Sequence, residues 1–116
     1  MYQYRAKVAR IIDADTVAFD IDLGFGVWRM NESCRLFGIN APEVVGENKA
    51  AGIAAKEALA SKMPVGLLVT ISTFKDNKEK YGRFLVLVHD KSENINEWLV
   101  ANGHAAYATF KSKPVS

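Results

Sequence analysis

Short runs of alternating apolar and polar residues limit what this chain can fold into more than any other feature. Residues 2–8 and 17–23 place an apolar side chain at every second position, which is typical of strands with one buried face. The polar residues 13–15 between these runs favour a tight turn, so the pair predicts a hairpin. A third extended stretch at residues 27–39 follows the glycine-rich turn 24–26. The first third of the chain is therefore predicted to be a meander of three strands.

An alanine-rich segment, residues 48–63, interrupts the strand pattern and ends before Pro64. Four of its apolar residues recur at the spacing of one helix face: Ala51, Ala55, Leu59 and Met63. The spacing and the proline together predict a helix. Gly52 costs up to about 1 kcal/mol relative to alanine inside a helix, so we expect close packing against the sheet at that position.

Two further strands are expected after this helix. Residues 67–73 alternate again, a charged loop is predicted at residues 75–80, and residues 84–89 form another apolar run. Five short strands with a helix between the third and the fourth are the order of a small Greek-key barrel of the OB (oligonucleotide- and oligosaccharide-binding) type. The predicted fold class is thus mostly β with α, an α+β five-stranded OB-type barrel.

A second, short helix is predicted near the C-terminus. Asn94 can cap it together with Glu97 three residues later, and Gly103 suits its end. Trp98 would lie on the apolar face of this helix, in the core. Residues 111–116 are expected to be a frayed tail, so the fold is predicted to have two helices and no third helix at the C-terminus.

Composition limits the class of protein. The chain has 116 residues, 49% of them hydrophobic, and we expect one domain, residues 1–116, with one core. The net charge of +2, from 15 Lys+Arg and 13 Asp+Glu, is too small to indicate a nucleic-acid partner by itself. Cys34 is the only cysteine, so no intrachain disulfide can form. No apolar run approaches the roughly 20 residues that cross a bilayer, and no signal peptide precedes the first strand. We therefore expect a soluble protein without a membrane partner, cytoplasmic or secreted after processing.

Four segments place charged groups at predicted turns and strand ends. In chain order they read Asp-x-Asp-Thr (residues 13–16), Arg-Leu-x-Gly-Ile-Asn-Ala-Pro-Glu (35–43), Lys-Tyr-Gly-Arg (80–83) and Asn-Glu-x-Leu-Val-x-x-Gly (96–103). In this order and at similar spacing, they resemble the motifs of the staphylococcal nuclease-like (thermonuclease) family. The resemblance covers nearly the whole chain, and four motifs in register are far more specific than any one of them.

This resemblance implies a metal-dependent phosphodiesterase, a micrococcal nuclease-like endonuclease that uses calcium to hydrolyse DNA and RNA. Water would attack phosphorus and leave a 3′-phosphate and a 5′-hydroxyl. The implied substrate is DNA or RNA, preferably single-stranded, and the implied oligomeric state is a monomer or a weak homodimer. A hard cation needs oxygen ligands. The matching candidates are Asp15, the side-chain carbonyl of Asn40 and the backbone carbonyl of Ala41.

The resemblance also assigns the catalytic side chains. Glu43 matches the family's carboxylate next to the attacking water, where it can accept a proton or orient the water. Arg35 and Arg83 match the two arginines that hold the phosphate, and their planar forks can donate paired hydrogen bonds to phosphoryl oxygens. Lys80 and Tyr81 match positions that contact a phosphate and the base or sugar. As residue types, Lys80 could equally be a solvated loop charge and Tyr81 a packing residue.

Two features of the second motif qualify this assignment. In a regular strand Arg35 and Asn40 would face opposite sides of the sheet, so the chain must bend between them, and Gly38 is the expected place. The best-known family members carry Asp and Thr where this chain has Asn40 and Ala41. Because an amide removes one negative charge from the ligands of the cation, we expect a single calcium ion that is held weakly.

A different class of function stays open beside the enzyme. The alternative is a non-catalytic OB-fold module that binds single-stranded nucleic acid or a protein partner. The presence of Asp15, Arg35, Glu43 and Arg83 favours the enzyme, because a binding module needs no carboxylate to activate water. Asn40 favours the alternative. A barrel unrelated to nuclease chemistry would require all four motif matches to be accidental.

Overall fold

Five strands wrap into a closed barrel in the computed structural model, which describes residues 1–78 and 82–108, with residues 75–78 described by their backbone alone. The barrel strands are β1 (Tyr2–Asp13), β2 (Thr16–Asp22), β3 (Trp28–Leu36), β5 (Leu68–Lys78) and β6 (Phe84–Asp90). They are paired in the order β3-β2-β1-β5-β6. The barrel closes because β3 also pairs with β6, in parallel, over residues 34–36 and 84–86. This confirms the predicted OB-type barrel.

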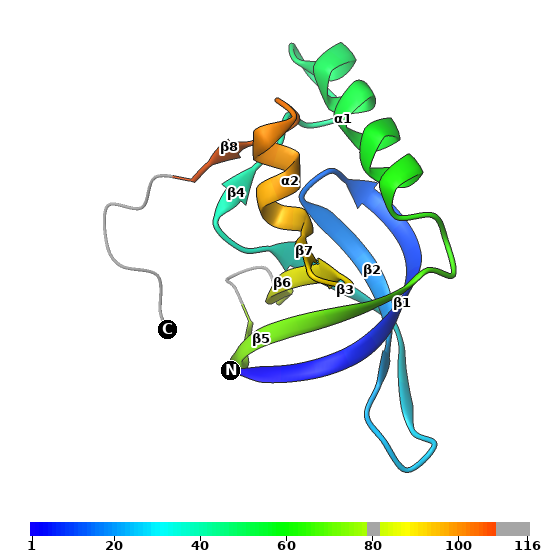
Figure 1. Cartoon of the computed structure of the whole chain (residues 1–116). Coiled ribbons are helices and arrows are strands. Elements are labelled where there is room, and N and C mark those ends of the chain that lie inside the picture. The colour runs from blue at the N-terminus through cyan, green and yellow to red at the C-terminus, as the bar shows by residue number, and fades with distance from the viewer. Residues whose placement is uncertain (79–81, 109–116) are drawn as a thin grey trace.

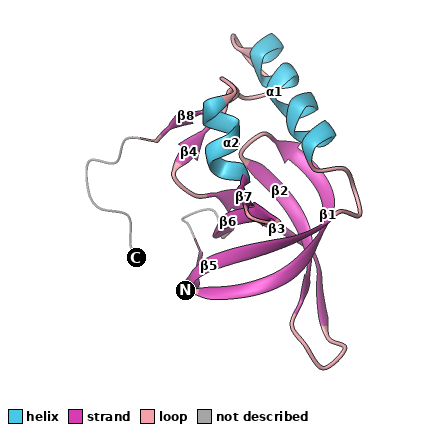
Figure 2. Cartoon of the chain, in the orientation of Figure 1, coloured by secondary structure: helices cyan, strands magenta, loops and turns pink. Residues whose placement is uncertain are grey.

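The remaining elements lie around the barrel. They are β4 (Ile39–Asn40), α1 (Lys49–Lys62), β7 (Glu93–Asn94), α2 (Ile95–Ala101) and β8 (Ala106–Tyr107). Both helices lie toward one end of the barrel, and the β2–β3 hairpin projects at the other end (Figures 1 and 2). No helix in the described part of the chain is both long and apolar enough to cross a membrane.

Alternation along the strands produces the core. In β1, Ala6 and Val8 are buried while Lys7 between them is exposed. Tyr2, which shares their face by alternation, is 51% exposed because it lies at the start of the strand, before β1 begins to pair with β2, so its expected burial was wrong. The largest fully buried side chains include Phe19, Leu36, Leu59, Ile71 and Leu99. Each is worth about 1.5–3 kcal/mol of apolar burial, and together they hold both helices against the barrel.

The third extended stretch is shorter than predicted. The strand β3 ends at Leu36, and residues 37–38 form a turn before β4, which pairs with β8 in a separate two-stranded sheet. Gly38 has a φ of +82°, a left-handed conformation that a residue with a Cβ adopts only with strain. The predicted bend at Gly38 is confirmed, whereas the continuous strand over residues 27–39 was wrong.

The two helices match their predicted positions. In α2, the Asn94 side chain accepts a hydrogen bond from the backbone N–H of Glu97 at 3.1 Å, which confirms the predicted cap. Trp98 packs against the core but is only partly buried. In α1, Ala51 is exposed, so only part of the predicted apolar face is buried.

Gly52 is buried in α1, but not for the predicted reason. A Cβ built on Gly52 would lie 2.0 Å from the carbonyl oxygen of Glu43 and 2.8 Å from the backbone nitrogen of Val44. The close approach is therefore to the loop between β4 and α1, and not to the sheet. Only glycine lets this loop lie directly on the helix.

The last correction concerns the charged segment after Thr73. The backbone of β5 continues to Lys78, which pairs with Phe84 after an irregularity in the register. The predicted loop at residues 75–80 is therefore strand as far as it is described, because pairing with β6 extends further than the alternation of apolar residues. The frayed tail expected at residues 111–116 lies outside the described residues.

Candidate active site

Asp15 lies at the centre of the site, in the tight turn between β1 and β2. Its side chain is almost buried, and its Oδ2 accepts a hydrogen bond from the backbone N–H of Ala41 at 2.8 Å. Its backbone carbonyl accepts from the N–H of Leu36 at 2.8 Å. These two contacts bind the turn to the end of β3 and to the residue that follows β4. Asp15 and Ala41, 26 positions apart in the chain, therefore come together as neighbours.

Arg35 reaches the same point from the end of β3. Its Nη2 donates to Oδ1 of Asn40 at 2.5 Å and lies 3.4 Å from Oδ2 of Asp15. Its Nη1 donates to the backbone carbonyl of Leu36 at 3.0 Å. The turn at Gly38 is what allows this arrangement, because it brings Asn40 back to the side of the sheet on which Arg35 lies. The structure thus brings together Asp15, Arg35, Asn40 and Ala41.

Arg83 approaches Asp15 through one intervening side chain. The hydroxyl of Thr16 donates to Oδ1 of Asp15 at 3.2 Å and accepts from Nη1 of Arg83 at 3.4 Å. Arg35 from the end of β3 therefore reaches the Asp15 carboxylate itself, and Arg83, directly before β6, reaches it through Thr16. Thr16 was part of the first motif, but we assigned it no role, because only the fold reveals that it links Asp15 to Arg83.

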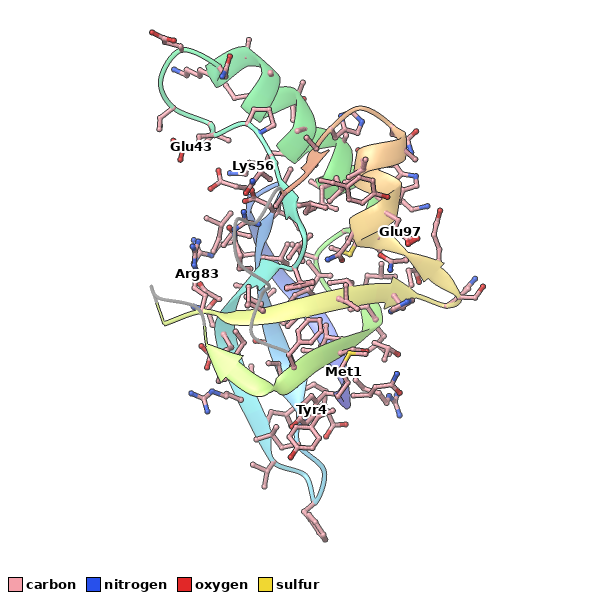
Figure 3. All side chains as sticks on the ribbon, turned by 90° about the vertical axis from the view of Figure 1, so that its left-hand side faces the viewer. Met1, Tyr4, Glu43, Lys56, Arg83 and Glu97 are labelled. Atoms are coloured by element: carbon pink, nitrogen blue, oxygen red, sulfur yellow. The ribbon has the colours of Figure 1, made fainter. Side chains whose placement is uncertain are left out.

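Glu43 lies on the loop between β4 and α1, and its side chain is exposed. Its backbone lies directly against Gly52 of α1, so this glycine limits how closely the loop approaches the helix. Figure 3 shows Glu43, Lys56 and Arg83 along the same side of the molecule. Glu43 therefore faces solvent on the side where Arg83 approaches Asp15.

Asp13 carries an unusual carboxylate at the edge of this group. Its Oδ1 is buried and has no hydrogen-bond partner among the described residues. The pKa of Asp13 is raised mainly by burial and next by the charge of Asp15, with Glu43 adding to the effect, whereas Lys56 opposes it. Burial and the neighbouring negative charges thus disfavour the ionised form of Asp13, and one of its oxygens lacks a partner among the described residues.

The orphan oxygen of Asp13 and the oxygens around Asp15 test whether these residues fit a cation. A buried carboxylate oxygen without a donor is costly unless it is paired with a proton or a positive charge. The side-chain oxygens of Asp15 and Asn40 both contact the guanidinium group of Arg35. No three His, Cys, Asp or Glu side chains in the described residues are close enough to form a metal centre. A hard cation held here would therefore have one carboxylate together with amide and carbonyl oxygens, a ligand set of low charge.

A groove of about 410 Å³ adjoins Asn40. Its walls are residues 40–42 on one side and residues 103–106 on the other, where β4 pairs with β8. The groove opens next to the proposed cation ligands and is large enough for part of a polymeric substrate. Lys80 and Tyr81, the two predicted substrate contacts, lie outside the described residues.

Asn96 is a structural residue of the site that we did not anticipate. Its side chain is buried in α2 and donates to the backbone carbonyls of Phe37 at 3.0 Å and Val86 at 3.2 Å. It also accepts from the N–H of Val88 at 3.1 Å. The amide therefore ties α2 and β6 to the turn that orients Asn40. Its motif was visible in the sequence, but a buried amide cannot be told from an exposed one without the fold.

Comparison with known proteins agrees with this geometry. Residues 33–116 match the family model of the staphylococcal nuclease homologues. The chain belongs to this family. It is also 32% identical over 101 residues to the thermonuclease of Staphylococcus hyicus, a match that covers 85% of this chain and 56% of that protein. The chain thus spans little more than half the length of this curated relative. The predicted membership of the staphylococcal nuclease-like family is therefore confirmed. The residues that meet around Asp15 lie in a chain of this family.

Proposed function

We propose that this chain is a calcium-dependent nuclease that hydrolyses phosphodiester bonds of DNA and RNA. The observation that carries the proposal is the approach of Arg35 and Arg83 to the Asp15 turn, with the carboxylate of Glu43 on the same side. Two cations and a free carboxylate around one oxygen-rich turn are the groups that phosphoryl transfer requires. Residues 1–116 act as one domain in this proposal.

The arginines would act on the phosphate. Arg35 already donates to three oxygens, those of Asp15, Leu36 and Asn40, and a phosphate placed between Asn40 and Arg83 offers the same kind of acceptor. As water attacks, negative charge grows on the phosphoryl oxygens, and both guanidinium groups then donate stronger hydrogen bonds. Their contribution is therefore larger in the transition state than in the bound substrate.

Glu43 would handle the nucleophile. Its exposed carboxylate can accept a proton from water or orient the water toward phosphorus. The new bond joins the water oxygen to phosphorus, and the bond from phosphorus to the 5′ oxygen breaks. The 5′ oxygen takes up a proton from solvent, so the products are a 3′-phosphate and a 5′-hydroxyl.

Asp15, Asn40 and Ala41 would hold the calcium ion. When bound, the ion supplies positive charge beside the scissile phosphate. Because Asn40 contributes no negative charge, we expect weak binding. Lys80 and Tyr81 would contact a phosphate and a base of a single-stranded substrate, since a ring stacks on any base.

The decisive experiment is cleavage of single-stranded DNA by the purified protein with calcium, with chelator, and after Glu43→Gln. We expect cleavage with calcium, none with chelator, and a loss of about 100-fold or more in Glu43→Gln, the usual size of a lost general base. Glu47→Gln, on the same exposed loop, is the matched control and should cleave like the wild type. Analysis of the product ends should find 3′-phosphates.

One observation favours a second candidate, a non-catalytic module that binds single-stranded nucleic acid. Arg35 contacts both Asp15 and Asn40, and so competes with a cation for their oxygens. If the wild type and Glu43→Gln bind an oligonucleotide equally and neither cleaves it with calcium, this second candidate replaces the nuclease.

A further inference from the structure

The β2–β3 hairpin stands away from the rest of the barrel. Pairing between β2 and β3 continues to Asp22 and Trp28, whereas β1 leaves β2 at Ile21. On the other side of β3, pairing with β6 covers only residues 34–36. Residues 22–28 therefore form the free end of a two-stranded hairpin, which projects beyond the barrel in Figure 1. Such a hairpin has few contacts of its own to stabilise it.

The tip of this hairpin is unusually apolar. Twelve large hydrophobic side chains are exposed in the described part of the chain, and five of them lie within residues 23–30. These are Leu23, Phe25, Val27, Trp28 and Met30. Phe25 is fully exposed at the apex, between two glycines. A concentration of this kind marks an interaction surface more often than scattered single residues do.

The backbone at Phe25 is strained. Its φ is +58°, between Gly24 at +82° and Gly26 at +74°. Asparagine or glycine adopts this left-handed conformation readily, but a bulky side chain does so at a cost. The apex therefore holds a phenyl ring in solvent where other residues would form the same turn more easily. Strain of this kind points to a role for the ring outside its own chain.

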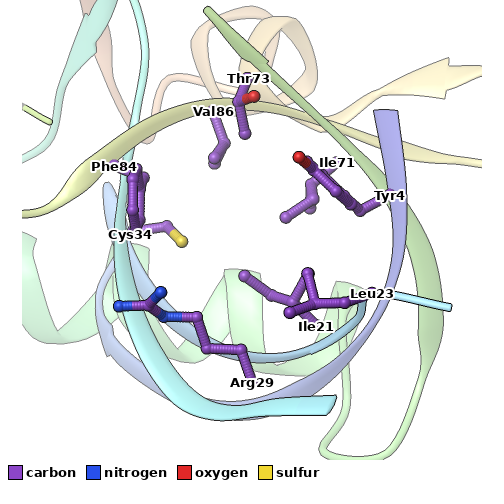
Figure 4. Close-up of a pocket in the computed structure, with 9 residues that line it drawn as sticks. All are labelled: Tyr4, Ile21, Leu23, Arg29, Cys34, Ile71, Thr73, Phe84 and Val86. Atoms are coloured by element: carbon purple, nitrogen blue, oxygen red, sulfur yellow. The ribbon is translucent and has the colours of Figure 1, made fainter. Parts of the chain in front are cut away.

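A cavity that fits such a ring opens at the mouth of the barrel. It measures about 460 Å³, and Figure 4 shows side chains from all five barrel strands around it. Its apolar wall includes Tyr4, Ile21, Cys34, Ile71, Phe84 and Val86. Only Arg29 among the lining residues is charged, and its guanidinium lies over the ring of Phe84. A cavity of about 150 Å³ already holds a benzene molecule, so this one has room for a phenyl side chain against two aromatic walls.

We propose that the cavity at the barrel mouth receives Phe25 of a second copy of this chain, so that two copies form a closed dimer. Leu23 and Arg29 of the hairpin line the mouth, so the tip and the mouth belong to one end of the molecule. When two copies are related by a two-fold axis midway between Phe25 and the cavity, the hairpin tip of each copy lies at the cavity of the other. Such an exchange closes with two copies and covers both the exposed ring and the open cavity.

The occupant is a second copy because this chain itself carries the group that the cavity fits. The cavity has no carboxylate in its wall, and its one charged lining residue, Arg29, already lies over an aromatic ring. Such a cavity suits the uncharged ring of Phe25. The proposal is independent of the nuclease function. Glu43 lies at the end of the molecule opposite Tyr4, which lines the mouth (Figure 3).

Sedimentation velocity over a concentration series tests the association. We expect the wild type to shift from monomer to dimer, and Phe25→Asn, which suits the left-handed turn, to stay monomeric with an unchanged circular dichroism spectrum. Val65→Asn is the matched control, since Val65 is 73% exposed in the turn between α1 and β5, and it should dimerise like the wild type. A wild type that stays monomeric at its solubility limit, assembles beyond a dimer, or dimerises equally well as Phe25→Asn overturns the proposal.

Discussion

Replacing Gly52 with alanine tests how the fold holds Glu43 in place. The new Cβ would lie 2.0 Å from the Glu43 carbonyl oxygen and 2.8 Å from the Val44 nitrogen. Ordinary contact begins at 3.4 Å, so the Glu43 carbonyl must retreat by about 1.4 Å. The helix cannot yield easily, because Ala55 and Leu59 anchor it in the core. The exposed loop therefore moves, and it carries the Glu43 carboxylate with it.

The expected effect is on rate more than on stability. Alanine favours a helix by up to about 1 kcal/mol over glycine, which offsets part of the cost of moving the loop. A displacement of about 1 Å of a positioned group can cost about 100-fold in rate. We therefore expect kcat/KM on single-stranded DNA to fall about 100-fold, about 2.7 kcal/mol of transition-state stabilisation. Calcium affinity should change less than the rate, because Asp15 lies on another segment and the proposed ligand residues Asn40 and Ala41 are held by Arg35 and Asp15.

The assay compares initial cleavage rates, calcium titrations and melting temperatures of the wild type and Gly52→Ala. Ala51→Ser is the matched control, because it adds one atom at the neighbouring exposed position of the same helix. If Gly52→Ala cleaves within threefold of the wild type at the same melting temperature, the loop either does not move or does not position a group that matters. Either result refutes the reasoning from the close approach to Glu43.

Three further outcomes are expected. Asn40→Asp should raise calcium affinity about tenfold, because it adds a negative charge to the ligand set; an unchanged calorimetric titration would show that this side chain is not a ligand. Asn96→Ala should lower the free energy of unfolding by about 3 kcal/mol, because it leaves buried backbone groups without partners; a urea midpoint equal to that of the wild type would contradict this. Burial raises the pKa of Cys34 from its ordinary value of 9.0 to about 12, so the unfolded chain loses this proton first and stability should fall as the pH rises from 9 toward 12. Urea unfolding of Cys34→Ala over this range should lack that part of the fall, and identical profiles would argue against a buried neutral thiol.

The barrel could be predicted because its signals are local. Alternation with a period of two depends only on which residues follow one another, and the same is true of the Asn94 and Glu97 cap. The predicted ends of strands were wrong where pairing between strands, or a turn, overrides the alternation of apolar residues. The strand β5 continues to Lys78 because β6 extends beside it, and β3 stops at Leu36 because Gly38 turns the chain.

Much of the candidate site was also predictable, through motif order and resemblance. Asp15, Arg35 and Asn40 were expected together, and the contacts between them are present. Thr16 between Asp15 and Arg83, and the orphan oxygen of Asp13, were not expected. These features depend on side-chain directions across elements that are far apart in the chain.

The sequence by itself determined the order of strands and helices, the nuclease family and the residue types that meet around Asp15. Only the tertiary structure decided that Gly52 supports the Glu43 loop, that Asn96 ties α2 and β6 to the Gly38 turn, and that a cavity at the barrel mouth lies at the same end of the molecule as an exposed phenyl ring. The physical reason is the distance along the chain between the residues that produce each feature. Periodicity and capping are set by residues within a few positions of one another, whereas close approach, cavities and orphan polar atoms arise only when distant segments pack.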